Sequence, residues 1–316
     1  MDKNILVLGG TGFVGTHVCE KLVRRGWAVT VPTRRLHRAQ ALQMLPGLTP
    51  LALDVHDARA LECVVRGHDA VVNLVAILHG SAAEFDRAHV LLPQKLAQAC
   101  RAGGVRRLVH VSALGVNDLH PDSRPSQYLR SKGRAESVLL HPADPTPVLD
   151  VRVLRPSVIF GTEDRFLNTF ATLQALFPVV PLACAHARFQ PVWVEDVASA
   201  VVRLVDGAAP LQADLPRIVE ACGPQVYTLG ELMRLAGRLS GAGGGRGRPI
   251  IPLPLWLGRL QAALMELSPG EPLMSRDNIA SMQVDNVASG TVPGLQDLGI
   301  APTPLEPVAR RYLARR

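Results

Sequence analysis

The segment Gly9-Gly10-Thr11-Gly12-Phe13-Val14-Gly15 decides the fold, because it follows a short apolar run, Asn4 to Leu8, and precedes a helical pattern. Its glycines fit both G-x-G-x-x-G and G-x-x-G-x-x-G. Such glycines permit a tight turn and let backbone N–H groups approach a pyrophosphate, while the last one allows close helix–strand packing. In this strand–turn–helix position the pattern predicts a dinucleotide site. The predicted contacts are Gly9, Thr11, Gly12, Phe13, Val14 and Gly15.

Outward from this segment, short apolar runs alternate with helical patterns, as a parallel sheet with helical crossovers requires. The predicted strands are Ile5–Leu8, Ala28–Thr33, Thr49–Leu53, Ala70–Val75, Arg107–Ser112 and Asp150–Leu154, the last ended by Arg155-Pro156. The predicted helices are Gly12–Arg25, Arg38–Leu45, Asp57–Val65, Phe85–Ala102 and Ser126–Leu140. We therefore expect an α/β protein with a doubly wound parallel sheet of Rossmann type.

The second predicted strand ends in Thr33-Arg34-Arg35, without the acidic residue that binds a ribose 2′-hydroxyl in NAD-selective sites. Two guanidinium groups suit a 2′-phosphate, so NADP(H) is the predicted cofactor and NAD(H) the less favoured one. In a chain so rich in arginine, either side chain can instead simply face solvent. The further predicted nucleotide contacts are Asp54 and Val55 after the third strand and Val75 after the fourth.

Composition excludes several classes of protein. The chain has 316 residues, 47% of them hydrophobic and 19% charged, as in ordinary globular proteins. Its net charge of +7 is scattered and only 4% of residues are aromatic, so we expect no nucleic-acid binding. The five cysteines and ten histidines lack metal-ligand spacing, so no metal site is expected. Apolar runs fall far short of the roughly 18 residues of a membrane span, and no signal-peptide pattern is visible, so a cytoplasmic protein is expected.

A Tyr-x-x-x-Lys pair, Tyr128 and Lys132, is the strongest catalytic candidate. Four residues apart on a helix, the two side chains share one face, and the ammonium can stabilise a phenolate that would otherwise form only near pH ~10. The tyrosine can then move a proton at a substrate oxygen while hydride is exchanged with a nicotinamide. Lys132 can also hold the nicotinamide ribose. A solvent-facing helical pair is the alternative.

With these motifs, the chain resembles the extended and atypical short-chain dehydrogenase/reductase superfamily. The resemblance runs from the N-terminus to about Leu235. The motifs that carry the resemblance are the glycine segment, Asn73, Ser112-Ala113-Leu114-Gly115, Tyr128-Leu129-Arg130-Ser131-Lys132, Arg155 to Gly161, and Pro191 to Ala198. Within the superfamily they look most like the branch that contains the nucleotide-binding accessory subunit of mitochondrial complex I and its bacterial relatives.

The resemblance implies a third catalytic residue, a hydroxyl near the end of the fifth strand that binds the substrate oxygen. Ser112 is the only hydroxyl there, since Ala113 and Leu114 replace the usual hydroxyl run, and an ordinary turn residue remains the alternative. The resemblance also implies that Pro156 lines the nicotinamide side. Asp196 is expected to cap the helix that follows it.

The expected organisation is a nucleotide-binding core of residues 1–161, to which residues 191–223 add a strand and a helix, and a smaller C-terminal substrate lobe of residues 162–190 and 224–316. In the lobe, residues 255–267 form a helical apolar stripe. It consists of Trp256, Leu257, Leu260, Ala263, Leu264 and Leu267. We expect this stripe to pack in the core of the lobe; docking to a membrane surface or a protein partner is the alternative.

Two functions fit the sequence. The first is an NADP(H)-dependent oxidoreductase that acts on an unknown small molecule through Tyr128 and Lys132. The second, implied by the resemblance, is a non-catalytic nucleotide-binding protein that stabilises or assembles a respiratory membrane complex, peripheral at the inner face of the membrane. The Tyr-Lys pair favours the first function, and the missing hydroxyl run favours the second.

Overall fold

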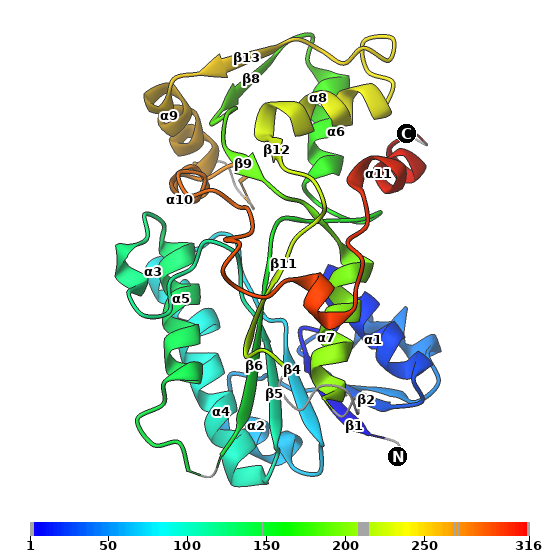
Figure 1. The fold of residues 1–316 in the computed structure, drawn as a ribbon, viewed down its shortest axis with the longest axis vertical. Coiled ribbons are helices and arrows are strands. Elements are labelled where there is room, and N and C mark those ends of the chain that lie inside the picture. The colour runs from blue at the N-terminus through cyan, green and yellow to red at the C-terminus, as the bar shows by residue number, and fades with distance from the viewer. Residues whose placement is uncertain (1–2, 147, 208–214, 268–269, 271, 315–316) are drawn as a thin grey trace.

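A seven-stranded sheet forms the centre of the computed structural model, which describes residues 3–146, 148–207, 215–267, 270 and 272–314 (Figure 1). From edge to edge its strands are β11 (Ile218–Ala221), β6 (Asp150–Pro156), β5 (Arg107–Val111), β4 (Ala70–Asn73), β1 (Asn4–Leu8), β2 (Ala28–Thr33) and β3 (Leu48–Ala52). All neighbours are parallel. The chain runs from β1 to β3 and then returns beyond β1 to β4, so the predicted doubly wound sheet is confirmed.

Helices cover both faces of the sheet. On one face lie α1 (Phe13–Arg24) and α7 (Val194–Asp206); on the other lie α2 (Ala58–Val65), α4 (Leu92–Gly103) and α5 (Gln127–Leu140). Side chains of a strand point alternately to opposite faces, so Ile5 and Val7 pack on the α1 side and Leu6 and Leu8 on the α2 side. Burial on both faces explains the continuous apolar runs.

Three local predictions differ from the structure. Residues 38–45 form no α-helix but lie in two 3-10 turns, Leu36–Ala39 and Leu42–Met44, ahead of Pro46-Gly47. The predicted helix Phe85–Ala102 is divided into α3 (Ala82–Asp86), a π-helical turn (Arg87–Leu91) and α4, because Pro93 has no N–H to continue the bonding. Strand β6 does not break at Arg155 but continues through Pro156, whose carbonyl accepts the Leu114 N–H at 3.0 Å.

The smaller lobe contains helices and three short strand pairs. The helices are α6 (Leu167–Leu176), α8 (Leu229–Leu239), α9 (Leu255–Glu266), α10 (Arg276–Ser281) and α11 (Leu305–Leu313). The strand pairs are β8 (Val180–Ala183) with β13 (Ile250–Leu253), β9 (Arg188–Phe189) with β12 (Tyr227–Thr228), and β7 (Ile159–Phe160) with β10 (Val192–Trp193). In the described ranges, no helix combines the length and apolar character needed to cross a membrane.

Two C-terminal contacts depart from the predicted organisation. Leu295 and Leu298 return to the core on the α7 side, so this turn does not belong to the lobe. The Asp196 carboxylate does not cap α7, which begins at Val194; it accepts the Thr303 N–H at 2.7 Å and the Thr303 hydroxyl at 3.1 Å. Asp196 therefore fixes the chain that leads into α11.

The expectation for the apolar stripe of α9 is wrong. Gly258 and Ala262 are its buried residues, whereas Trp256, Leu260 and Leu264 are 66%, 53% and 61% exposed. The helix therefore turns its small residues toward β8 and its large apolar residues toward solvent.

Candidate functional site

The carboxyl ends of the central strands lie along one edge of the sheet, and the predicted site residues follow them. The glycine segment follows β1, Arg34 follows β2, Asp54 and Val55 follow β3, Val75 follows β4, Ser112 follows β5, and Pro156 ends β6. The order β4-β1-β2 puts the change of winding direction at β1. Open α/β sheets bind ligands at this point.

The glycine segment forms a cradle that side chains would fill. Gly9 has a φ of +79°, and a Cβ on it would lie 3.0 Å from the backbone of Leu74. A Cβ on Gly15 would lie 2.3 Å from the Gly9 carbonyl oxygen, so α1 packs directly against the turn. Gly12 differs, because a Cβ there would meet only that oxygen, at 3.3 Å.

The N-terminus of α1 is open to an anion. Gly12 is its N-cap residue, no side-chain cap bond is found in the described part of the chain, and its first turn contains no acidic residue. Phe13 and Val14 form that first turn and Thr11 precedes it. Free N–H groups at a helix N-terminus attract phosphate oxygens, so the residues present fit a dinucleotide pyrophosphate.

The end of the site at β2 and β3 is rich in cations. Arg34 and Arg35 are both exposed, and the Asp54 carboxylate accepts the His56 N–H at 3.0 Å. Burial lowers the pKa of His56; Arg87, Arg34 and Lys95 lower it further, and Asp54 opposes them. Lys95 and Arg87 come from α4 and the turn before it, so only the fold brings them near His56, whose carbonyl accepts the Lys95 ammonium at 3.2 Å.

Tyr128 and Lys132 share one face of α5, but they do not form the expected pair. The Lys132 ammonium is buried and donates to the Val111 carbonyl at 3.1 Å, and burial lowers its pKa to about 8 against the opposing charge of Glu136. Burial raises the pKa of Tyr128 to about 12. No described residue hydrogen-bonds the Tyr128 hydroxyl. Because the ammonium is bound to β5, it does not stabilise a phenolate here.

Two rings pack around Tyr128. The Phe85 and His89 rings approach it edge-on, with centroids 6.3 and 5.6 Å away. His89 Nε2 accepts the Ile77 N–H at 3.0 Å and Nδ1 lies 2.8 Å from the Ser131 hydroxyl, so the ring is held on both sides. The sequence analysis missed His89, because a single histidine in a helical pattern gives no signal of its own.

Ser112 is buried, and its hydroxyl lies near the Glu136 carboxylate, whose pKa it lowers. The structure therefore does not join it to Tyr128, and the third catalytic position stays a prediction. Two residues earlier, His110 Nε2 has no hydrogen-bond partner among the described residues, while its Nδ1 lies 3.1 Å from the Asn73 amide nitrogen. Burial lowers the pKa of His110 well below the usual range, and Lys132 adds to this effect.

A buried ion network supports α5 behind Lys132. The Arg155 guanidinium binds both oxygens of the buried Glu136 carboxylate, with two bonds of 3.0 Å, and it reaches Asp118 at 2.8 Å. Burial raises the pKa of Glu136, against the opposing effect of Arg155. The network fixes α5 to the end of β6.

The lobe contacts the start of the tyrosine helix. The Asp277 carboxylate on α10 accepts the backbone N–H groups of Gln127 and Tyr128, at 2.6 and 3.1 Å. A cavity of about 340 Å³ adjoins this contact. It is lined by His79, Gly80, Phe85, Glu266, Gly270, Pro272, Ser275 and Asp277. Tyr128 is not among the lining residues, but two of them contact it: the Phe85 ring packs against the Tyr128 ring, and Asp277 accepts the Tyr128 N–H.

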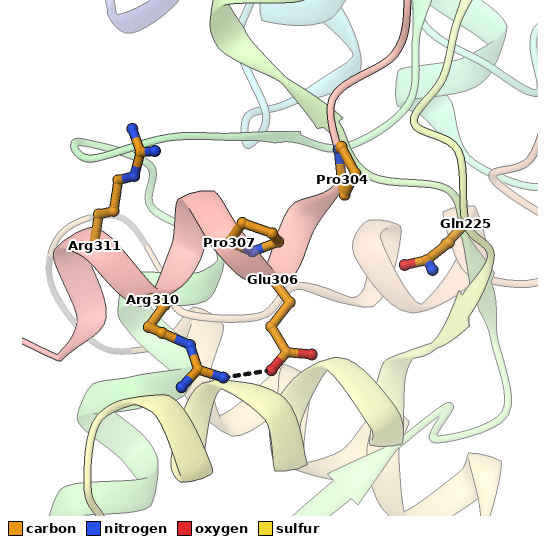
Figure 2. A pocket seen from close by; sticks show the side chains of 6 residues that line it. All are labelled: Gln225, Pro304, Glu306, Pro307, Arg310 and Arg311. Carbon is orange, nitrogen blue, oxygen red and sulfur yellow. Dashed lines mark hydrogen bonds and ion pairs between the residues drawn. The ribbon is translucent and has the colours of Figure 1, made fainter.

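A second hollow of about 630 Å³ lies along α11 (Figure 2). It is lined by Gln225, Pro304, Glu306, Pro307, Arg310 and Arg311. None of these is a predicted site residue, and Arg310 is paired with Glu306 at 2.8 Å. We assign it no part in the site.

Comparison with known proteins agrees with this geometry. Residues 9–168 match a family model described as NAD(P)H-binding. The chain is 32% identical to the NADH dehydrogenase [ubiquinone] 1 alpha subcomplex subunit 9 of Rattus norvegicus, over 95% of this chain and 77% of that protein. It is 26% identical to a ceramide reductase of Caulobacter vibrioides, over 72% of this chain and 77% of that protein.

Among solved structures, a dTDP-glucose 4,6-dehydratase from Streptomyces venezuelae, with NAD bound, has the same fold. It superposes with a TM-score of 0.70 at 23% identity, covering 98% of this chain and 95% of that one. The chain thus belongs to the NAD(P)H-binding, atypical short-chain dehydrogenase/reductases, in the branch of the mitochondrial complex I accessory subunit.

Proposed function

We propose that this protein binds NADP(H) and acts as an oxidoreductase through Tyr128 and Lys132. One observation carries the proposal: the glycine cradle and the tyrosine helix both follow carboxyl ends of the parallel strands, and a cavity lined by Phe85 and Asp277 adjoins the start of that helix. The cavity can hold a small substrate beside Tyr128.

The bound nicotinamide supplies or accepts hydride at the substrate carbon. Within the chain, the α1 N-terminus would hold the pyrophosphate, and Lys132, which now donates to the Val111 carbonyl, would hold the nicotinamide ribose. In that position its charge can lower the pKa of the Tyr128 phenol. Tyr128 then gives its proton to the substrate oxygen in reduction, or takes one in oxidation. Pro156, at the end of β6, would line the nicotinamide side.

Cofactor choice tests the first half of the proposal. Arg34 and Arg35, exposed at the end of β2, favour a 2′-phosphate, so NADPH should bind more tightly than NADH. Arg34→Gln should lower NADPH affinity about 10- to 100-fold, since a charged hydrogen bond contributes ~1.5–3 kcal/mol, and leave NADH affinity nearly unchanged. Arg38→Gln is the matched control. Equal affinities for the two nucleotides in a fluorescence titration would contradict the NADP(H) assignment.

Removal of the phenol tests the second half. Tyr128→Phe keeps the ring contacts to Phe85 and His89 but removes the transferable proton. We expect turnover of any carbonyl substrate to fall about 10²-fold or more, with NADPH affinity unchanged. Full turnover in this variant, in a stopped-flow assay of NADPH oxidation, would exclude Tyr128 as the proton donor.

A nucleotide-binding subunit of a respiratory membrane complex is the second candidate. Two observations favour it: Ser112 has no bond to Tyr128, and the relative that matches over 95% of this chain is a mitochondrial NADH dehydrogenase subunit. In that case Tyr128→Phe changes nothing measurable, and the nucleotide stays bound through purification. Mass spectrometry of the native protein, with co-purification of respiratory subunits, separates the two candidates.

A further inference from the structure

Carboxylates line the cavity that adjoins the tyrosine helix, and no lysine or arginine is among the lining residues that the structure describes. Glu266 comes from the end of α9 and Asp277 from α10, so both belong to the smaller lobe. A Cβ on Gly80 would lie 3.2 Å from the Glu84 carboxylate, which puts a third acidic group beside a lining residue. Of the described lining residues, only His79 can carry a positive charge.

The Arg276 guanidinium, between two lining residues in the sequence, is already paired. Its Nε donates to one Glu266 oxygen at 2.8 Å, and its backbone N–H donates to the other at 2.7 Å. Burial opposes ionisation of Glu266, but these bonds and the charges of Arg276 and His79 hold its pKa below the usual value. Glu266 is therefore ionised, and Arg276 balances that charge instead of leaving a cation for a ligand.

Helix N-termini, which can bind phosphate, are filled by the chain's own side chains at this cavity. At the start of α5, the Asp277 carboxylate accepts the Gln127 and Tyr128 N–H groups. Before α3, the Glu84 carboxylate accepts the Ser81 N–H at 2.8 Å and its hydroxyl at 2.9 Å. The start of α10 is capped by the hydroxyl of Ser275, itself a lining residue. An anion in the cavity would find none of these positions open.

Uncharged groups surround the Tyr128 ring. Phe85 lines the cavity and packs edge-on against Tyr128. Burial, with the charges of Lys132 and His110, lowers the pKa of His89 to about 2, so the His89 ring beside Tyr128 is neutral. Four apolar side chains complete the cluster around Tyr128: Ala113, Val116, Leu129 and Val284. A charged group brought to Tyr128 would lose its hydration without a partner to replace it.

We infer that the cavity admits an uncharged carbonyl compound with an apolar body and rejects phosphates and carboxylates, with Glu266 and Asp277 as its specificity-determining residues. An anion would lie against ionised carboxylates, without a free guanidinium, ammonium or helix N-terminus among the described lining groups. A nucleoside diphosphate is excluded first, because it carries the most charge. The volume of about 340 Å³ fits a compact molecule. The inference rests on the proposed function for the reaction, but charge selection is a property of binding alone.

Isothermal titration of the protein–NADPH complex with two ligands of the same shape tests the inference. 4-Acetylbenzamide is neutral, and 4-acetylbenzoate carries a carboxylate in place of the amide. We expect the amide to bind at least about tenfold more tightly, and UDP-glucose not to bind. Tyr128→Phe should keep this ratio of affinities, because the phenol proton has no part in charge selection.

Two reciprocal variants separate charge from folding. Glu266→Gln removes one carboxylate and frees the Arg276 guanidinium, so the preference for the amide should fall about tenfold. Arg276→Gln leaves Glu266 without its partner, so the preference should rise about threefold. Glu62→Gln, at an exposed position of α2, is the matched control and should leave the ratio unchanged. All three variants should keep the NADPH affinity of the unmodified protein.

Three outcomes overturn the inference: 4-acetylbenzoate or UDP-glucose binds as tightly as the amide, neither acetyl compound binds, or the two reciprocal variants fail to shift the ratio in opposite directions. If Glu266→Gln lowers the melting temperature, the rise or absence of a rise in Arg276→Gln decides. If the amide is preferred but NADPH is not oxidised, the charge selectivity stands and the proposed oxidoreductase function fails.

Discussion

Acidification should destabilise this protein through two buried histidines. His89 uses Nε2 to accept the Ile77 N–H, which assigns its ring proton to Nδ1, and His110 lies buried on β5 beside Asn73. A second proton on His89 would face the Ile77 N–H. Burial, with the charge of Lys132 adding to it, lowers the pKa of His89 to about 2 and places that of His110 well below its usual value.

Proton linkage gives the direction in which the unfolding free energy changes with pH. In the unfolded chain each histidine titrates near pH ~6.5, whereas in the folded protein both stay neutral, so below that pH the unfolded state binds more protons. The stabilising contribution is complete above pH ~6.5 and is lost as the pH falls below it, at about 1.4 kcal/mol per pH unit per histidine. At pH ~5 each histidine should therefore lower the unfolding free energy by about 2 kcal/mol.

Urea unfolding at a series of pH values measures this loss. His89→Gln keeps an acceptor and a donor but cannot titrate, so its stability should fall about 2 kcal/mol less between pH ~7.5 and pH ~5 than that of the unmodified protein. His37→Gln, at an exposed position, should leave the slope unchanged. If His89→Gln and the unmodified protein lose the same free energy, the buried neutral histidine is not the cause.

Two further predictions concern the cradle and the ion network. Gly12→Val, at a φ of −87° that valine tolerates, should leave the melting temperature nearly unchanged but abolish NADPH binding in a titration. Gly15→Ala should instead lower the melting temperature, because its Cβ would lie 2.3 Å from the Gly9 oxygen. NADPH affinity retained by Gly12→Val would contradict the assignment of the glycine cradle to the pyrophosphate. Glu136→Gln should lower the unfolding free energy by about 3 kcal/mol, because it removes the carboxylate that pairs with the buried Arg155 guanidinium. A loss below about 0.5 kcal/mol in urea unfolding would show that Asp118 alone balances the charge of Arg155.

The sequence by itself determined the nucleotide-binding core. The glycine segment, the alternation of apolar runs with helices, and the Tyr128–Lys132 spacing are local features, and local backbone preference and periodicity specify them without knowledge of distant contacts. The fold class and the position of the cradle followed from them, whereas the order of the strands is seen in the structure.

Tertiary structure decided where the side chains of those elements point and what meets them. Lys132 binds the Val111 carbonyl, and Asp277 reaches the start of α5 from about 150 positions further along the chain, which no spacing rule reveals. Arg34, Arg87 and Lys95 act together on the His56 imidazole for the same reason.

Helix α9 shows most clearly what sequence periodicity cannot predict. Periodicity identified which of its residues share a face, and the apolar face was expected inside. Only the approach of Ala183 to Gly258 decides the orientation, because the 2.5 Å left for a Cβ admits the small face and turns the large side chains toward solvent.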